Sequence, residues 1–136
     1  MNPILRNVLA VVAGIIVGGV INMGLIYLGP VIIPPPEGAD MTTMEGIKAA
    51  MPQMETKHFI MPFVAHAIGT LSGAYTAARL AYSNHFRLAV GIGFFFLVGG
   101  VMAAIQLPSP LWFEVFDIVV AYLPMGWLGW KMTVRE

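Results

Sequence analysis

The sequence contains no cysteine, few charged residues and no net charge. Without cysteine the chain cannot form disulfides, thiolate metal sites or a cysteine nucleophile. Charged residues make up 10% of the chain, whereas soluble globular domains contain about 25%. A balanced charge gives no basis for attracting a polyanion, so we expect no nucleic-acid partner.

Hydrophobic residues are abundant instead, at 58% of the 136 residues. They gather in four runs, and a membrane-spanning helix needs about 20 apolar residues. Little of the chain remains for a separate soluble module. The sequence therefore predicts an all-α integral membrane bundle of four transmembrane helices that forms a single transmembrane domain over residues 1–136. The expected spans are residues 6–29, 58–82, 87–107 and 111–131, with an outer loop at residues 30–57.

The distribution of basic residues predicts the orientation, because lysine and arginine mark the cytoplasmic ends of membrane spans. Most of them lie on one side of the predicted spans, namely Arg6, Arg79, Arg87, Lys131 and Arg135. The opposite side carries most of the acids, among them Glu37, Asp40, Glu45 and Glu55. We therefore expect both termini in the cytoplasm of a bacterial cell, with the outer loop facing the periplasm or the exterior from the inner membrane.

The first span has a face of small residues. Gly14, Gly18 and Asn22 recur at intervals of four, which places them on one side of a helix. Small residues let a second membrane helix approach closely, so this face is expected to pack against another span. Pro30 and prolines 34–36 are expected to end the helix, since proline lacks the amide hydrogen and fixes φ.

Methionines recur at helical spacing in the outer loop. They predict a short amphipathic helix on the membrane surface, interrupted near Pro52, over residues 41–54. Flexible methionines commonly fill irregular apolar faces. The alternative interpretation is a Cu(I) site, because thioether and imidazole groups suit that ion. Its expected ligands are His58, Met41, Met44, Met51 and Met54.

The last span carries two carboxylates, Glu114 and Asp117, inside an apolar stretch. Helical geometry places both acids on one side, which we expect to face the bundle. Bulky residues lie on the opposite side and are expected to face lipid: Trp112, Phe116, Leu123, Trp127 and Trp130. Pro124 is expected to kink this helix, because the carbonyl four residues earlier loses its donor.

Polar residues from all four spans are expected at a similar depth, in the outer part of the bundle. They are His66, Glu114, Asp117, Asn22 and Gln106. An ionisable group inside a membrane is costly unless it is paired or hydrated, so such residues indicate a functional site. The alternative is structural, with Asp117 hydrogen-bonded to His66 or Asn22.

Three functions remain open at this point. The favoured hypothesis is a non-enzymatic protein that binds or conducts a proton, a cation or a small cationic solute, as a homo-oligomer in the lipid bilayer. The second is an accessory or structural subunit of a larger membrane complex. The third is a membrane metal-binding protein with either the Cu(I) site or a His/carboxylate site. A metal ion is thus the one cofactor left open, and no nucleophile or phosphate-binding loop indicates an enzymatic reaction.

Overall fold

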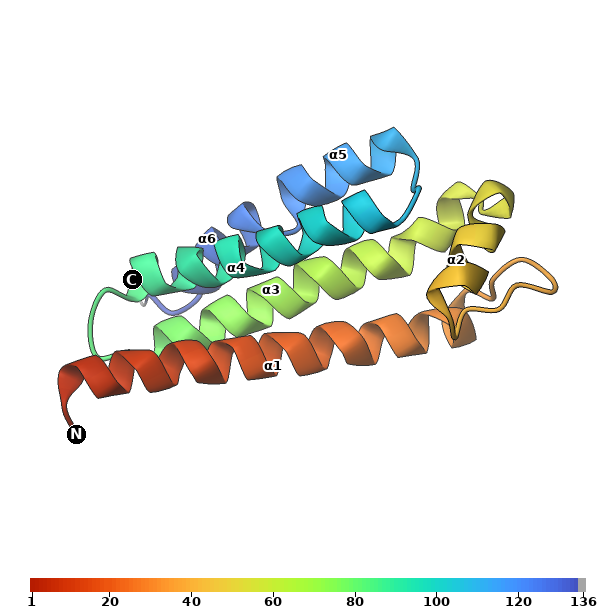
Figure 1. The fold of residues 1–136 in the computed structure, drawn as a ribbon. Coiled ribbons are helices and arrows are strands. Elements are labelled where there is room, and N and C mark those ends of the chain that lie inside the picture. The colour runs from red at the N-terminus through yellow and green to blue at the C-terminus, as the bar shows by residue number, and fades with distance from the viewer. Residues whose placement is uncertain (135–136) are drawn as a thin grey trace.

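A computed structural model describes residues 1–134 (Figure 1). These residues form six α-helices and two short 3₁₀ helices, with no strand among them, which confirms the predicted all-helical class. The helices are α1 (Pro3–Ile32), α2 (Met44–Ala50), η1 (Met51–Gln53), η2 (Thr56–Phe59), α3 (Ile60–Leu80), α4 (His85–Gln106), α5 (Leu111–Val120) and α6 (Leu123–Lys131).

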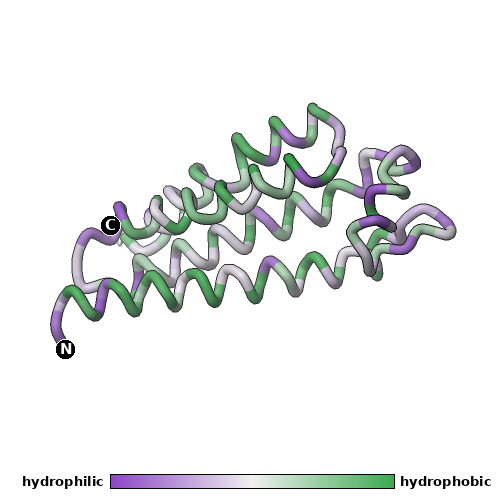
Figure 2. The backbone as a smooth tube through the Cα atoms, in the orientation of Figure 1, coloured by the Kyte–Doolittle hydropathy of each residue, from purple (hydrophilic) through white to green (hydrophobic). Residues whose placement is uncertain are grey.

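Within residues 1–134, three helical segments are long and apolar enough to cross a membrane, which indicates a membrane protein. They are α1, α4 and the segment Leu111–Lys131, which contains α5 and α6. Helix α3 is less apolar, and it lies between α1 and α4 (Figure 1). Its buried positions are mostly alanine and glycine, because neighbouring helices cover it on several sides. Figure 2 shows the contrast, with green predominating along α1 and paler colours along α3.

The bundle has two distinct ends. The loop end carries α2, η1 and η2, whereas the terminal end carries the start of α1, the turn between α3 and α4, and the end of α6 (Figure 1). At the terminal end, Asn7 holds the α3–α4 turn: its side-chain oxygen accepts from the amides of Tyr82 and Ser83 at 2.8 and 3.2 Å. Arg6 donates from Nε to the Leu80 carbonyl at 2.9 Å. Arg135, one of the basic residues used above, lies outside the described residues.

Helices α1 and α3 meet at glycines. A methyl group added at Gly14 would lie 2.6 Å from the Gly73 carbonyl oxygen, and one added at Gly18 would lie 2.7 Å from that of Gly69. No real Cβ fits at such distances, so the two backbones are in direct contact. The small-residue face expected on the first span is therefore the face that packs against α3.

The core of the terminal half consists of small side chains. Ala74, Ala77, Ala78, Ala89 and Ile92 are buried together. Trp130 packs against this cluster and against Phe86 at 5.0 Å between ring centroids. The expectation that Trp130 faces lipid is therefore wrong. The interruption between α5 and α6 turns α6 relative to an ideal continuous helix, which brings this ring against the core.

Helix α1 does not end at Pro30, contrary to expectation. It continues to Ile32, and the Ile33 amide donates to the Gly29 carbonyl at 2.8 Å. A proline in the last turn removes one helical hydrogen bond only, and the residue before it, Gly29, has no Cβ to clash with the proline ring. Prolines 34–36 then follow outside the helix.

The last span is broken at Tyr122, which is a larger distortion than the expected kink. Helix α5 closes with the Ala121 amide donating to the Asp117 carbonyl at 2.9 Å, and the Gly126 amide donates to the Tyr122 carbonyl at 2.8 Å in α6. Tyr122 itself has φ −119° and ψ −79°. Pro124 cannot donate to Val120, so the chain starts a new helix with Pro124 in its first turn.

The predicted loop helix is shorter than residues 41–54. Helix α2 begins after Thr43, whose hydroxyl accepts from the Gly46 amide at 3.0 Å, a common N-cap arrangement. Asp40 accepts from the amide and the hydroxyl of Thr42 at 2.9 and 2.6 Å. These hydrogen bonds, the hydroxyl one foremost, hold the pKa of Asp40 below its ordinary value. The α-helix ends at Ala50, and Pro52 lies in the tighter turn η1.

Candidate functional site

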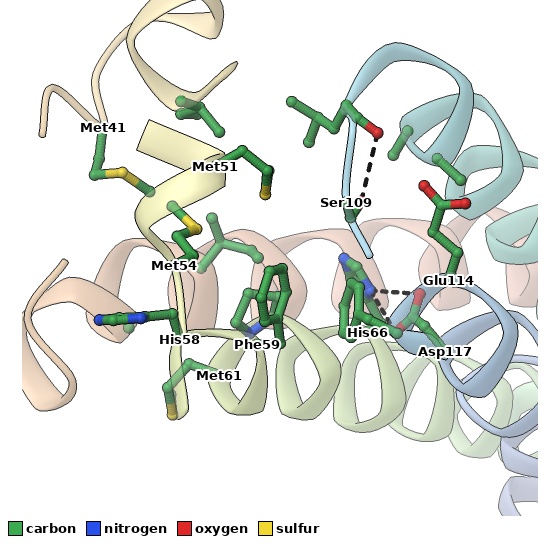
Figure 3. A pocket seen from close by; sticks show the side chains of 18 of the residues that line it. Met41, Met51, Met54, His58, Phe59, Met61, His66, Ser109, Glu114 and Asp117 are labelled. Carbon is green, nitrogen blue, oxygen red and sulfur yellow. Dashed lines mark hydrogen bonds and ion pairs between the residues drawn. The ribbon is translucent and has the colours of Figure 1, made fainter. Parts of the chain in front are cut away.

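A cavity of about 230 Å³ lies at the loop end, where the helices separate. We call it the loop-end cavity, and most of its lining is apolar. The lining comes from the end of α1, the segment from Met41 to Phe59, the start of α3, the end of α4 and helix α5. Figure 3 shows methionines and His58 at one end of the cavity, and His66, Glu114 and Asp117 at the other.

His66 and Asp117 form a pair at the polar end of this cavity. Nδ1 of His66 lies 2.9 and 3.0 Å from the two carboxylate oxygens of Asp117. The Tyr122 hydroxyl donates to the same carboxylate at 2.8 Å. The rings of His66 and Tyr122 stack with their centroids 5.9 Å apart. The buried carboxylate of Asp117 on α5 therefore links α3 to the α5–α6 break.

The geometry assigns different roles to the two nitrogens of His66. An ionised carboxylate only accepts hydrogen bonds, so Nδ1–H of His66 and the Tyr122 hydroxyl are the donors to Asp117. In the neutral imidazole Nε2 then carries a lone pair and acts as an acceptor. Within residues 1–134, Nε2 has no hydrogen-bond partner, and the His66 side chain remains 21% exposed on the cavity side. Asp117 thus fixes the ring and leaves an acceptor available in the cavity.

Glu114 is the second acid of the cavity. It lies one turn before Asp117 on α5 and lines the same space. In Figure 3 its carboxylate is turned away from the His66–Asp117 pair. Among residues 1–134 it has neither a hydrogen-bond partner nor an ion-pair partner. A partly covered carboxylate next to apolar walls favours a cationic neighbour, because it has lost part of its hydration.

Asn22 and Gln106 do not join this group. Neither lines the loop-end cavity. Asn22 packs against Gly69, where an added methyl would meet its Cβ at 2.8 Å, and its amide nitrogen lies 3.9 Å from the Met23 sulfur. Gln106 is exposed at the end of α4. Of the five predicted residues, the structure therefore brings three to the cavity, namely His66, Glu114 and Asp117.

Four of the five residues predicted to bind Cu(I) line the cavity, His58 among them. Met41, Met51 and Met54 line the cavity, whereas Met44 is 45% exposed and lies outside its lining. His58 uses both ring nitrogens: Nδ1 accepts from the Glu55 amide at 2.8 Å, and Nε2 donates to the Pro34 carbonyl at 3.1 Å. In this arrangement neither nitrogen has a free lone pair for a metal. Cu(I) binding stays a prediction that requires His58 to leave both partners.

A harder metal ion also lacks a ready set of ligands. Within residues 1–134, no three histidine, aspartate or glutamate side chains come together as a metal site would require. The His66–Asp117 pair supplies two groups, but Nδ1 and the carboxylate are already bonded to each other. The His/carboxylate hypothesis stays a prediction, because the described residues show only part of a ligand set.

Several residues that line the cavity or bond to Asp117 were not identified from the sequence. Tyr122 was missed because it lies five residues after Asp117, which in an unbroken helix is about 140° around the axis. The aromatic wall formed by Phe59 and Phe113, with centroids 4.8 Å apart, was missed as well. Met61 also lines the cavity. A signal for Tyr122 exists in Pro124, since a proline two residues later marks the point where helical geometry fails.

Fold and site together describe a helical membrane protein with a mostly apolar cavity at one end and a histidine–carboxylate pair inside it. Comparisons with protein-family models, with curated proteins and with solved structures gave no match.

Proposed function

We propose that this protein is a non-enzymatic membrane protein that binds a small cationic solute in the loop-end cavity, from the outer side of a bacterial inner membrane. The proposal includes α3 as a fourth span, because it is 21 residues long and lies between the apolar helices. It also places the terminal end in the cytoplasm, where Arg6, Arg79, Arg87 and Lys131 would lie.

The observation that carries the proposal is the charge of the cavity. Glu114 and Asp117 both line it, and no lysine or arginine is among the described residues that do. Asp117 already has two donors from the protein, whereas Glu114 has none within residues 1–134. An apolar pocket with a few convergent polar groups is the usual form of a small-molecule site. The unbalanced negative charge favours a cation as the occupant.

The structure favours binding over conduction by a single chain. No residue of the alanine-rich core of the terminal half lines the cavity. That core, together with the glycine contacts between α1 and α3, fills the terminal half of the bundle. A solute would therefore need a rearrangement of the helices, or a second copy of the chain, to travel further. Transport stays a prediction, and the binding step is the part that the cavity supports.

The test is calorimetric titration of the full-length protein in lipid nanodiscs with 2-phenylethylamine at neutral pH. Glu114→Gln removes the charge and keeps the shape, so we expect it to weaken binding at least about tenfold, equivalent to about 1.4 kcal/mol. Glu45→Gln is the matched control, since Glu45 is exposed on α2 and lies outside the cavity lining. Equal binding by the wild type and Glu114→Gln, or no binding by either, would overturn the proposal.

A further inference from the structure

We infer that the loop-end cavity selects protonated amines, cations that carry N–H groups, over quaternary ammonium ions and metal ions. The inference rests on the proposed function and specifies the class of cation. Its basis is the arrangement of acceptors, because negative charge alone would attract any cation.

The first step is the fixed orientation of His66. Asp117 takes the hydrogen of Nδ1 at 2.9 Å, and the Tyr122 hydroxyl holds the same carboxylate at 2.8 Å. The imidazole ring also stacks on the ring of Tyr122. A histidine nitrogen whose partner nitrogen donates to a carboxylate is a directed acceptor, as in metal and catalytic sites. In the neutral imidazole, Nε2 of His66 therefore offers one lone pair to the cavity in a direction fixed by these contacts.

The second step is the match between acceptors and donors. Glu114 lines the same cavity with its carboxylate turned away from the His66–Asp117 pair (Figure 3), so the cavity offers a charged acceptor in addition to Nε2. A primary ammonium group has three N–H donors and no acceptor, which suits both kinds of acceptor. A quaternary ammonium ion carries the charge without a donor, so Nε2 would lose its contact with water and gain no hydrogen bond. A metal ion would find Nε2 and the Glu114 carboxylate, but residues 1–134 bring no three histidine or acidic side chains together to complete a metal site.

The third step concerns the apolar part of the ligand. The lining away from the acids contains Met51, Met54, Met61 and Phe59 (Figure 3). Phe113 also lines the cavity and packs against Phe59. Methionine side chains adapt to irregular shapes and make favourable contacts with aromatic rings. An apolar cavity of about 150 Å³ is large enough for benzene, and this cavity measures about 230 Å³. One ring with a short aminoalkyl chain therefore fits, with the ring toward the methionines and the ammonium group toward Glu114.

His66 faces no positive group that would already repel an amine. The titratable residues around it are Asp117 and Glu114 on α5 and Tyr122 at the α5–α6 break, with His58 elsewhere on the cavity wall. The described segments of α1 and α4 that line the cavity contribute apolar residues and glycine. A cationic occupant is therefore not opposed by a fixed charge of the protein.

The experiment compares three probes of similar shape against the full-length protein in nanodiscs: 2-phenylethylamine, phenethyltrimethylammonium and 2-phenylethanol. We expect the amine to bind at least about tenfold more tightly than each of the others, because only it combines charge with N–H donors. Quaternary binding as tight as amine binding, with both lost in Glu114→Gln, would overturn the amine selectivity and leave cation binding intact. No binding of any probe would overturn both proposals.

Two variants of His66 test the residue that carries the selectivity. His66→Leu removes the acceptor, so we expect the preference for the amine over the quaternary ion to fall by about tenfold or more. His66→Gln places an amide oxygen near the former Nε2 and should retain part of the preference, which a merely structural role would not predict. An unchanged preference in a folded His66→Leu protein would contradict the inference. If His66→Leu fails to fold, His66→Gln alone carries the test. Complete loss of the preference for the amine over the quaternary ion in folded His66→Gln would then contradict the inference, provided that the amine still binds at least as tightly as 2-phenylethanol.

Discussion

The two halves of the bundle are built from different side chains and do different things. In the terminal half, glycines and alanines bring backbones into contact, as where Gly14 meets Gly73. In the loop half, methionines and aromatic rings hold the helices apart around a cavity of about 230 Å³. Small residues leave no space and tolerate no added atom, whereas long flexible side chains can adjust to an occupant. The terminal half therefore leaves no room for an occupant, whereas the loop half contains a cavity.

Helix α3 belongs to both halves and shows the change within one element. Its later turns present Gly73, Ala74 and Ala77, all buried. Its second turn presents His66, which faces the cavity and the acid on α5. The His66–Asp117 pair therefore lies only a few turns from the close-packed part of α3. This is the arrangement that a preorganised binding site needs.

The largest expected effect comes from an added methyl group in the terminal half. Gly14→Ala places a Cβ 2.6 Å from the Gly73 carbonyl oxygen, so α1 and α3 must move apart. We expect a loss of about 1–3 kcal/mol in the free energy of unfolding, as for other overpacked cores. The measurement is thermal unfolding in detergent, followed by tryptophan fluorescence.

Gly24→Ala is the matched control on the same helix. Gly24 has nothing within 4 Å of the added methyl, so this change should be neutral or stabilise the helix by up to about 1 kcal/mol. Equal losses in the two variants would contradict the close contact between α1 and α3 at Gly14.

A smaller effect is expected at the boundary between the halves. Tyr122→Phe keeps the ring that stacks on His66 and removes the hydroxyl that donates to Asp117 at 2.8 Å. Loss of one hydrogen bond to a charged group costs about 1.5–3 kcal/mol when both groups are buried, and nearer 1 kcal/mol when water replaces the donor. Because the cavity adjoins Asp117, we expect about 1 kcal/mol in denaturant unfolding. Tyr27→Phe, at a residue 75% exposed, should have no measurable effect.

The smallest effect concerns the loop that covers the cavity. The hydrogen bonds from Thr42 lower the pKa of Asp40, so the folded loop binds this proton less readily than the unfolded chain. Their stabilising contribution is complete above the ordinary aspartate pKa of about 3.9, and it is lost as the pH falls through the lowered value. A carboxyl NMR titration should find Asp40 below its ordinary range. Thr42→Val should move the pKa upward, and an unchanged value would contradict this account.

Much of the fold was predictable because helical periodicity survives in regular helices. Gly14 and Gly18 share one face in any α-helix, and that face does pack against α3. The same reasoning placed His66 and Asp117 at one depth, facing the bundle, and the structure joins them at 2.9 Å. Their role in ligand binding stays a prediction.

The sequence was less informative wherever the helices are irregular. Trp130 lies beyond the break at Tyr122, so a wheel for one continuous helix assigned it the wrong side. Tyr122 lies at the break itself, where such a wheel does not apply. Asn22 and Gln106 do not line the cavity. The depth of a residue in a span follows from counting residues along the helix, but the neighbour that its side chain faces depends on how the helices pack, which one sequence does not reveal. The start of α2 is set by the N-cap Thr43, and Asp40 binds Thr42 just before it.

The contact between Asn7 and the α3–α4 turn has a consequence for biosynthesis. Asn7 bonds to Tyr82 and Ser83, residues synthesised long after α1 has formed. During translation α1 therefore enters the membrane with its glycine face uncovered, and that face finds its partner only after α3 has emerged from the ribosome. The hydrogen bonds of Asn7 to Tyr82 and Ser83 can form only when α1 and α3 lie side by side. A chain that stalls before this point would expose the glycine face to other nascent helices, and to the cell's quality-control proteases.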